Sequence, residues 1–310
     1  MDNKINFRPQ TFEEFYGNEE IVDNLKIFIH SAKLKKTCID HTLIYGLPGT
    51  GKTTLASLIS AEMNKKIKII QGNNIQKNSD IINLVLSLNE GDILFIDEIH
   101  AINQACIEIF YSVMEDFAID INIGKDFNSK TTRINIPHFT LIGATTILGK
   151  IQQPFQDRFG IMLFIKQYDE RAIFKILNNI CKKISLNLTE NEINKVVQHS
   201  KLIPRIAIRL IKRIEDFRNY DPTISVDEIF TKLKIFENGI DCEDIHYLKK
   251  LQNFNYPIGI KTISQATEID INTLETKIEP FLMRNCYIEK TNLGRKITNS
   301  GINLIKKIIE

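Results

Sequence analysis

The sequence predicts an α/β fold, in which a parallel sheet with helices on both faces is followed by an all-helical domain and a small terminal domain. Apolar segments alternate with helical segments over the first part of the chain, which is typical of a parallel sheet. After Tyr168 the pattern is helical, and from residue 241 three helical stretches precede a short hairpin. The predicted domains are therefore residues 1–166, 167–240 and 241–310.

The elements of the first domain follow one another in a regular order. The predicted strands are residues 41–46, 67–71, 93–97, 139–145 and 161–165. The predicted helices are residues 19–33, 52–63, 79–88 and 103–114. Because helices separate most of the consecutive strands, the strands should lie parallel and the helices should cover both faces of the sheet.

An insertion between Ala118 and Pro137 breaks this alternation. Isoleucines alternate with other residues on either side of a polar stretch, which predicts an exposed β-hairpin. We expect Ile119, Ile121 and Ile123 to form a surface for a partner protein, and packing onto their own domain is the alternative.

The terminal domain has the pattern of a winged helix, a variant of the helix-turn-helix in which a hairpin follows the helices. Basic residues predominate in two segments, 201–218 and 284–296. Such segments indicate contact with nucleic acid, and a solvated face is the alternative. The net charge of +2 is too small to decide between them.

The composition is that of an ordinary water-soluble protein, with 43% hydrophobic and 25% charged residues among 310. No apolar stretch approaches the roughly 18 residues of a membrane span, and the N-terminus has no secretion signal. We therefore expect a cytoplasmic protein without membrane contact. The five cysteines lie far apart without CxxC spacing, which indicates neither a disulfide framework nor a zinc site.

Residues 46–53 have the pattern of a phosphate-binding loop, in which three glycines precede Lys52 and Thr53. The glycines let the backbone bend around phosphates, so that N–H groups and the start of the following helix point at the anion. Lys52 would reach the β- and γ-phosphates, and the Thr53 hydroxyl would bind Mg²⁺. A strand precedes the loop and a helix follows it, so the sequence predicts binding of a nucleoside triphosphate.

Two acidic residues, Asp97 and Glu98, end the apolar strand that follows. Asp97 would support the Mg²⁺, and Glu98 could activate the attacking water. A pair of acids at the end of a strand can also be merely solvated. Their position behind a phosphate-binding loop favours catalysis, so the sequence predicts hydrolysis of the triphosphate.

Several segments resemble the RuvB family, the Holliday-junction branch-migration motors of the AAA+ class. The resemblance covers nearly the whole chain, and its segments are residues 7–12, 40–41, 46–54, 91–100, 114–120, 139–146, 157–161 and 204–207. The segments MEDFAID at 114–120, TLIGATT at 140–146 and DRFGI at 157–161 are much more specific to the family than the phosphate-binding loop is.

The resemblance implies a P-loop AAA+ sheet, a helical lid domain and a C-terminal winged helix. It makes Thr146 the first sensor, which reads the γ-phosphate, and Arg205 the second sensor, which brings the lid onto the nucleotide. Arg158 matches the arginine finger, which completes the site of a neighbouring subunit. The other positions that the resemblance places on the ATP are Arg8, Gly46, Gly49, Gly51, Thr54, Glu115, Asp116, Phe117 and Tyr168.

The resemblance also implies partners. A finger that acts on a neighbour requires a ring, and the family implies a homohexamer around duplex DNA. RuvA would dock on the hairpin, and a RuvC-like resolvase is a further partner. By hypothesis, Lys290, Arg295 and Lys296 hold the phosphate backbone of the DNA without reading its sequence.

The chain departs from the family pattern at a few positions. Ile147, Gln156 and Leu293 each stand where the family usually has arginine, and the hairpin has Asp126-Phe127-Asn128 in place of Gly-Pro-Gly. We expect hydrolysis to survive these changes, and the contacts between subunits and with DNA to change, because each lost phosphate contact lowers affinity for DNA.

Two other classes of function fit part of the pattern. A clamp-loader-like ATP switch acting on DNA has the same loop, acids and finger, but gives no reason for a C-terminal winged helix. An initiator or regulator that uses ATP only to assemble gives no reason for Glu98 and Arg158 to be present together.

Overall fold

The computed structural model describes residues 7–123, 130–254 and 256–309. The chain forms two compact units, one of Met1–Ser185 with Ile203–Arg205 and one of Leu186–Leu202 with Ile206–Glu310. The first unit extends past the predicted boundary at residue 166. Its last helix, which contains Lys183, is held there by an ion pair of 2.7 Å between Lys183 Nζ and Glu14 Oε2.

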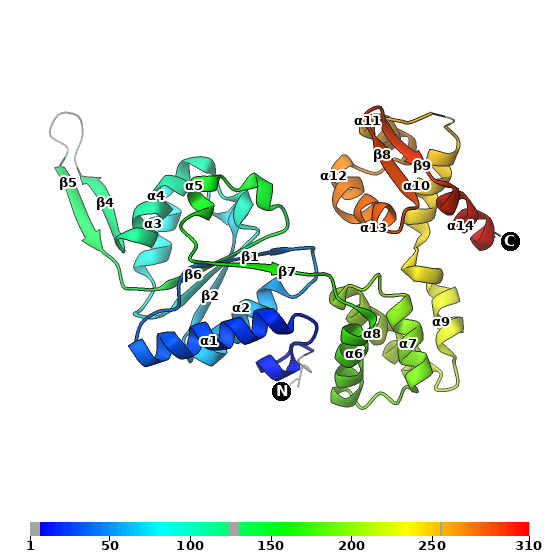
Figure 1. Cartoon of the computed structure of the whole chain (residues 1–310), viewed down its shortest axis with the longest axis horizontal. Coiled ribbons are helices and arrows are strands. Elements are labelled where there is room, and N and C mark those ends of the chain that lie inside the picture. The colour runs from blue at the N-terminus through cyan, green and yellow to red at the C-terminus, as the bar shows by residue number, and fades with distance from the viewer. Residues whose placement is uncertain (1–6, 124–129, 255, 310) are drawn as a thin grey trace. The chain divides into compact units, whose positions relative to one another are not determined.

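The first unit contains a parallel sheet of five strands in the order β2-β3-β6-β1-β7, which confirms the predicted fold class (Figure 1). The strands are β1 (Thr42–Gly46), β2 (Ile67–Gln71), β3 (Ile93–Asp97), β6 (Thr140–Thr145) and β7 (Ile161–Ile165). Because the strands are parallel, all their carboxyl ends lie at one edge, where loops can gather around a ligand.

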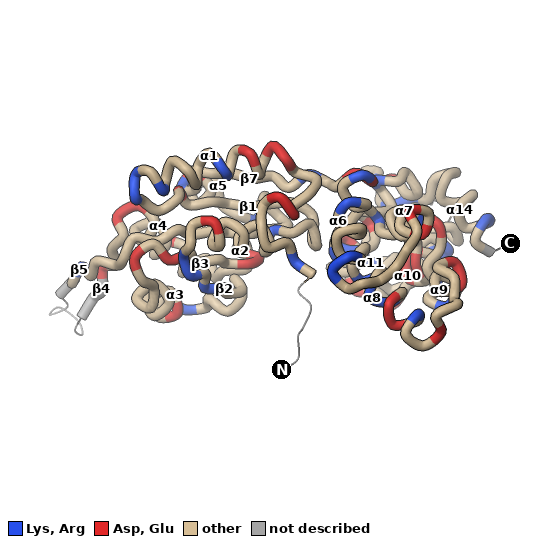
Figure 2. The backbone as a smooth tube through the Cα atoms, turned by 90° about the horizontal axis from the view of Figure 1, so that it is seen from below, with Lys and Arg blue, Asp and Glu red and all other residues tan. Residues whose placement is uncertain are grey.

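Helices cover both faces of this sheet, with α1 and α2 on one face and α3 and α4 on the other (Figure 1). The helices of the unit are α1 (Glu19–Lys35), α2 (Lys52–Met63), α3 (Asn78–Leu86), α4 (Gln104–Glu115), α5 (Gln153–Gln156) and α6 (Glu170–Lys183). Helix α1 begins with acidic residues and ends with basic ones, as Figure 2 shows, which favours the helix dipole.

Alternate residues of the strands point into the layers of helices. Leu94 and Ile96 of β3 and Leu141 of β6 pack with Phe110 of α4 and Phe155 of α5, and all five side chains are buried. Removing this apolar surface from water fixes the positions of the strand ends, from which the loops of the candidate site start.

The insertion forms the predicted hairpin, with β4 (Ala118–Ile123) antiparallel to β5 (Lys130–Asn135), and it projects from the end of α4 (Figure 1). The prediction that Ile119 belongs to a partner surface is wrong. Its side chain is only 3% exposed and packs in the core of its own domain, because the base of the hairpin lies on the end of α4. Residues 126–128 and the side chains of Ile121 and Ile123 lie outside the described part of the structure.

The second unit contains the helical segment after α6 and the winged helix. Its helices are α7 (Glu190–Gln198), most of α8 (Pro204–Tyr220), α9 (Val226–Leu233), α10 (Cys242–Gln252), α11 (Ile260–Thr267), α12 (Ile271–Thr273), α13 (Glu279–Arg284) and α14 (Asn299–Ile309). The predicted wing is confirmed as an antiparallel pair, β8 (Ile288–Thr291) with β9 (Gly294–Ile297). Leu248, Ile263 and Leu282 pack with Ile288 of the wing in a core of their own.

Candidate nucleotide-hydrolysis site

The phosphate-binding loop lies between the carboxyl end of β1 and the start of α2. Gly51 precedes α2 with a φ of 100°, and Gly49 has a φ of 79°, conformations that other residues adopt only with strain. Lys52 is 6% exposed, and its Nζ donates hydrogen bonds to the carbonyls of Gly46, at 2.9 Å, and Leu47, at 3.0 Å. The lysine therefore lies inside the loop, at the centre of the space that a phosphate would take.

Burial lowers the pKa of Lys52, and the carboxylates of Glu98 and Asp97 oppose that shift. The two carboxylates thus keep a cation in the loop, where it can neutralise phosphate charge. Thr54 follows in the first turn of α2 and is half-buried.

A hydroxyl and a carboxylate meet beside the loop. Thr53 Oγ1, in the first turn of α2, donates to Asp97 Oδ2, at the end of β3, over 3.3 Å. Mg²⁺ in triphosphate sites is held by one or two such oxygens, with waters and phosphate oxygens as the other ligands. Thr53 and Asp97 therefore fit Mg²⁺ that arrives with a nucleotide. Among the described residues, no group of three or more His, Cys, Asp or Glu side chains could hold a metal by itself.

Glu98 follows Asp97 immediately after β3, and Thr146 fixes the position of its side chain. Its backbone has φ 48° and ψ 51°, a left-handed conformation that is uncommon for residues other than glycine. Its Oε2 accepts hydrogen bonds from Thr146 Oγ1 at 3.1 Å and from the Thr146 N–H at 3.3 Å. The structure therefore brings the predicted water-activating group and the predicted first sensor into contact, across the ends of β3 and β6.

His100 completes this group. Its Nδ1 lies 3.2 Å from Glu98 Oε2 and 2.9 Å from Thr145 Oγ1. Burial lowers the pKa of His100, which favours a neutral ring beside the Glu98 carboxylate. The signal available in the sequence was its place two residues after Glu98, where the chain leaves the sheet edge.

Two more predicted positions meet the loop from segments distant in sequence. The Arg205 N–H donates to the Gly49 carbonyl at 3.3 Å, and the Arg205 side chain is exposed. The Tyr168 hydroxyl is buried and donates to the Thr50 carbonyl at 2.9 Å. Burial raises the pKa of Tyr168, so the phenol keeps the proton that it donates. The side chain of Tyr168 therefore stabilises the loop by binding the backbone of the loop at Thr50.

Four of the remaining predicted positions, Arg158, Glu115, Asp116 and Phe117, have printed contacts with residues outside the loop. Arg158 Nε lies 3.3 Å from Glu115 Oε1, and the guanidinium stands 4.0 Å from the centre of the Tyr111 ring. Asp116 pairs with Arg133 at 2.7 Å. The Phe117 ring lies tilted against the His138 ring, with 4.2 Å between ring centroids. Arg8 is exposed near the start of the described chain, where its carbonyl accepts a hydrogen bond from Gln10.

His41 shows where this second group lies. Its Nε2 lies 3.1 Å from the Met114 carbonyl, its Nδ1 accepts from the Leu141 N–H at 2.9 Å, and its own carbonyl accepts from Ile161. His41 immediately precedes β1, whereas the phosphate-binding loop follows β1. Five residues of strand span about 16 Å, so Glu115 and Arg158 lie near the opposite edge of the sheet from Lys52.

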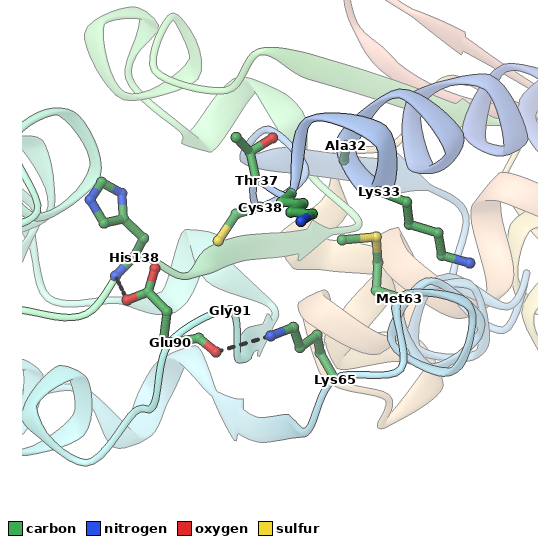
Figure 3. A pocket seen from close by; sticks show the side chains of 10 residues that line it. Ala32, Lys33, Thr37, Cys38, Met63, Lys65, Glu90, Gly91 and His138 are labelled. Carbon is green, nitrogen blue, oxygen red and sulfur yellow. Dashed lines mark hydrogen bonds between the residues drawn. The ribbon is translucent and has the colours of Figure 1, made fainter.

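A cavity of about 440 Å³ opens at this amino edge as well (Figure 3). Its walls include Cys38, Lys65 and Glu90, and Lys65 Nζ donates to the Glu90 carbonyl at 3.2 Å. The cavity is thus separate from the phosphate-binding loop. The candidate hydrolysis site is defined instead by the contacts of Lys52, Thr53 and Glu98.

Of the three wing residues predicted to contact DNA, two are exposed and one is buried. Lys290 and Lys296 are exposed on β8 and β9. Arg295 is only 6% exposed, with Nε 2.9 Å from Glu279 Oε1 and Nη2 3.2 Å from Glu275 Oε1. The prediction that Arg295 holds DNA is therefore wrong for this structure, because its guanidinium points into the domain and is already bound to carboxylates.

Arg295 instead stabilises the winged helix, and its replacement should show this. Glu279 is 1% exposed and also accepts from the Tyr247 hydroxyl at 2.9 Å. We expect Arg295→Met to lower the free energy of unfolding by about 3–5 kcal/mol, because it leaves a buried carboxylate without its cation. Urea unfolding of the full chain measures this, with Lys296→Met on the exposed face as control. Equal stability of the two variants would contradict the assignment.

Three family models match consecutive parts of the chain. The RuvB P-loop domain, described as that of a Holliday junction DNA helicase, matches residues 7–165. The RuvB AAA lid domain matches residues 168–241, and the RuvB C-terminal winged helix domain matches residues 237–306. The chain belongs to the RuvB family.

Curated relatives agree over nearly their full lengths. The Holliday junction branch migration complex subunit RuvB of Mycoplasma genitalium is 48% identical over 293 residues, which are 94% of this chain and 95% of that protein. The subunit of the same name from Ureaplasma parvum is 47% identical over 307 residues, 99% of this chain and 98% of that one. The solved Thermotoga maritima RuvB, titled a Holliday junction branch migration motor, has a TM-score of 0.86 at 31% identity, covering 97% of this chain and 98% of that structure.

The departures from the RuvB pattern have separate structural settings. Leu293 lies at the tip of the wing and is 78% exposed, so an apolar side chain stands at the turn between β8 and β9. Gln156 donates to the Ile151 carbonyl at 2.8 Å, and the Ile147 N–H donates to Thr145 Oγ1 at 3.0 Å. Neither Gln156 nor Ile147 interrupts the contact between Thr146 and Glu98.

Proposed function

We propose that this chain is an ATP-driven DNA motor that moves Holliday junctions by branch migration in recombination and repair. The observation that carries the proposal is the contact of Thr146 with Glu98 behind the Thr53–Asp97 pair, in a chain that ends in a winged helix with exposed lysines. The first part is the arrangement of a hydrolase, and the second part is that of a DNA-binding domain.

Each group of the site has a definite task. Lys52 and the N–H groups of the glycine loop bind the phosphates, and Thr53 and Asp97 hold Mg²⁺ against them. Mg²⁺ neutralises charge on the phosphates when it is bound. Glu98, held by Thr146 and His100, orients and activates the attacking water. Thr146 is the first sensor, and its hydroxyl transfers its hydrogen bond from Glu98 to the γ-phosphate. Arg205 reaches the nucleotide as the second sensor.

Arg158 acts on a neighbouring subunit. It lies near the opposite sheet edge from Lys52 of its own chain, so its guanidinium can meet a γ-phosphate only when another chain presents one. Glu115, Asp116 and Phe117 share that edge and contact the neighbour's nucleotide. Subunits joined in this way form a ring, for which we propose six members around duplex DNA.

The proposed partners rest on membership of the family and on the exposed lysines of the wing. Lys290 and Lys296 bind the DNA backbone without reading sequence. A RuvA-like junction-binding protein docks on the hairpin at Ile121 and Ile123, and a RuvC-like resolvase acts on the same junctions. Among the described residues, no helix is long and apolar enough to cross a membrane. Because the proposed substrate is DNA, we propose that the protein acts in the cytoplasm.

A clamp-loader-like switch is not favoured by the comparisons, since the relatives are named as branch-migration subunits. The two functions differ in ATP consumption. A motor hydrolyses many ATP molecules during one engagement with DNA, whereas a switch stops after about one for each subunit.

The test is migration of a synthetic four-way junction by the protein with its cognate junction-binding partner, ATP and Mg²⁺. We expect strand exchange that requires ATP and the partner. Lys52→Ala should abolish it, because the phosphates lose the cation at the centre of the loop. ATP hydrolysis stimulated by DNA without any migration would reject the motor and leave the nucleotide chemistry in place.

A further inference from the structure

A buried ion pair joins the helical segment to the winged helix within the second unit. Lys201 Nζ lies 2.5 Å from Asp244 Oδ2 and 4.0 Å from Asp241 Oδ2. The side chain of Lys201 is 10% exposed and that of Asp244 is 2% exposed. Lys201 follows α7, whereas Asp244 lies in the first turn of α10, so the pair connects two segments that are distant in sequence.

Further contacts fix this pair in place. Lys201 Nζ also stands 4.5 Å from the centre of the Phe281 ring in α13, which adds a cation–π interaction with the core of the winged helix. Asp244 accepts a hydrogen bond from the Asp241 N–H at 3.0 Å. Burial raises the pKa of Asp244, and the neighbouring ammonium of Lys201 opposes that shift. Each charge of the pair therefore depends on the other.

The backbone beside the pair has little freedom. Lys201 and Leu202 have φ values of 53° and 56°, two consecutive left-handed residues without glycine. A Cβ added to Gly239, in the link between the two domains, would lie 2.4 Å from the His199 carbonyl oxygen. Ser200 is fully buried and donates to the Val197 carbonyl at 2.7 Å. The segment 199–202 thus packs closely against the link at Gly239.

The segment 199–202 is followed closely by Arg205, the proposed second sensor. Arg205 follows Lys201 by four residues, and Pro204 between them restricts the backbone further. Coupling between distant sites can be carried by packed side chains, ion pairs and rigid elements that join them. Here the backbone of Arg205 is bound to the phosphate-binding loop, and the ammonium of Lys201 is bound to the winged helix.

We propose that Lys201 is a positioning residue that makes the winged helix follow the Arg205 segment, through its contacts with Asp244 and Phe281. The inference rests on the proposed motor function. When the nucleotide state moves Arg205, the segment 201–205 carries that displacement to α10 and α13, and so to the wing between α13 and α14. Without the pair, the lid responds to ATP and the wing does not follow.

The test compares Lys201→Met, Lys201→Arg and Asp244→Asn in the full-length protein with its partner and a four-way junction. Methionine keeps the length and apolar stem of lysine, arginine keeps the charge, and asparagine keeps the shape of aspartate. Lys307→Met is the matched control, because Lys307 pairs with Glu237 across the same two domains but is 67% exposed. The readouts are ATP hydrolysis without DNA, its stimulation by DNA, and base pairs migrated per ATP.

We expect Lys201→Met and Asp244→Asn to hydrolyse ATP without DNA at rates within about twofold of the unaltered protein. Migration per ATP and stimulation by DNA should fall at least tenfold, whereas Lys201→Arg and Lys307→Met should retain them. Unchanged migration per ATP in Lys201→Met, or an equal loss of hydrolysis without DNA, would overturn the proposal. Should Lys201→Met fail to fold, Asp244→Asn decides by the same criteria. Absence of migration by the unaltered protein would instead reject the motor function itself.

Discussion

Arg158→Ala should bind ATP normally and hydrolyse it about 10³ to 10⁵ times more slowly, which is the typical contribution of an arginine finger. Binding should survive because Arg158 lies near the opposite sheet edge from Lys52, with Glu115 and Tyr111 as its partners. The measurement is kcat in the presence of DNA, together with the affinity for a fluorescent ATP analogue. Arg171→Ala, an exposed arginine of α6, is the control and should leave both unchanged.

Mixing two inactive variants tests whether the finger acts on a neighbour. Lys52→Ala cannot bind ATP but keeps its finger, whereas Arg158→Ala binds ATP but lacks one. In a mixed ring, the finger of the first variant completes the site of the second, so hydrolysis should reappear. A mixture as inactive as its components would show that Arg158 acts within its own chain or not at all.

The second large effect is expected for Glu98→Gln. Loss of a general base typically costs 10²- to 10⁴-fold in rate, and ATP affinity should stay unchanged or rise. Glutamine can still accept from Thr146, so the sheet edge should keep its structure while the attacking water loses its base. A filter assay with labelled ATP, alongside single-turnover hydrolysis, measures retention and rate.

A control for this change exists on the same domain. Glu62 lies near the end of α2, where its Oε2 is 3.8 Å from Lys33 Nζ at the surface. Glu62→Gln removes an identical charge away from the phosphate-binding loop and should leave hydrolysis unchanged. Normal turnover by Glu98→Gln would assign the activation of water to another group.

Local pattern was sufficient for the sheet and the phosphate-binding loop. The predicted bounds of β2, β3, β7 and α2 match the structure, because continuous apolar runs and a glycine-rich loop mark where such elements begin and end. The roles predicted for Lys52, Thr53, Asp97 and Glu98 rest on spacing within two short motifs. The structure places these four side chains together at one sheet edge.

Long-range pairing was not visible in the sequence. Arg295 is basic and lies in a wing, but its partner Glu279 belongs to a helix sixteen residues earlier in the chain and is buried with it. Ile119 alternates like its neighbours, yet alternation does not tell which strand positions face a core. His100 and Lys201 acquire their partners only when the sheet and the two helical domains have folded.

The five residues of β1 also separate the loop that would bind ATP from Arg158, the residue proposed to speed its hydrolysis. Under the proposed function, a lone chain has the loop, the Thr53–Asp97 pair and Glu98 together, whereas its own Arg158 lies about one strand length away. Dispersed chains would therefore hold nucleotide with little turnover, and hydrolysis per chain would rise with the fraction of chains that have a neighbour. In the absence of DNA, the rate of ATP hydrolysis would then be limited by the fraction of chains that assemble. DNA that promotes assembly would raise this rate.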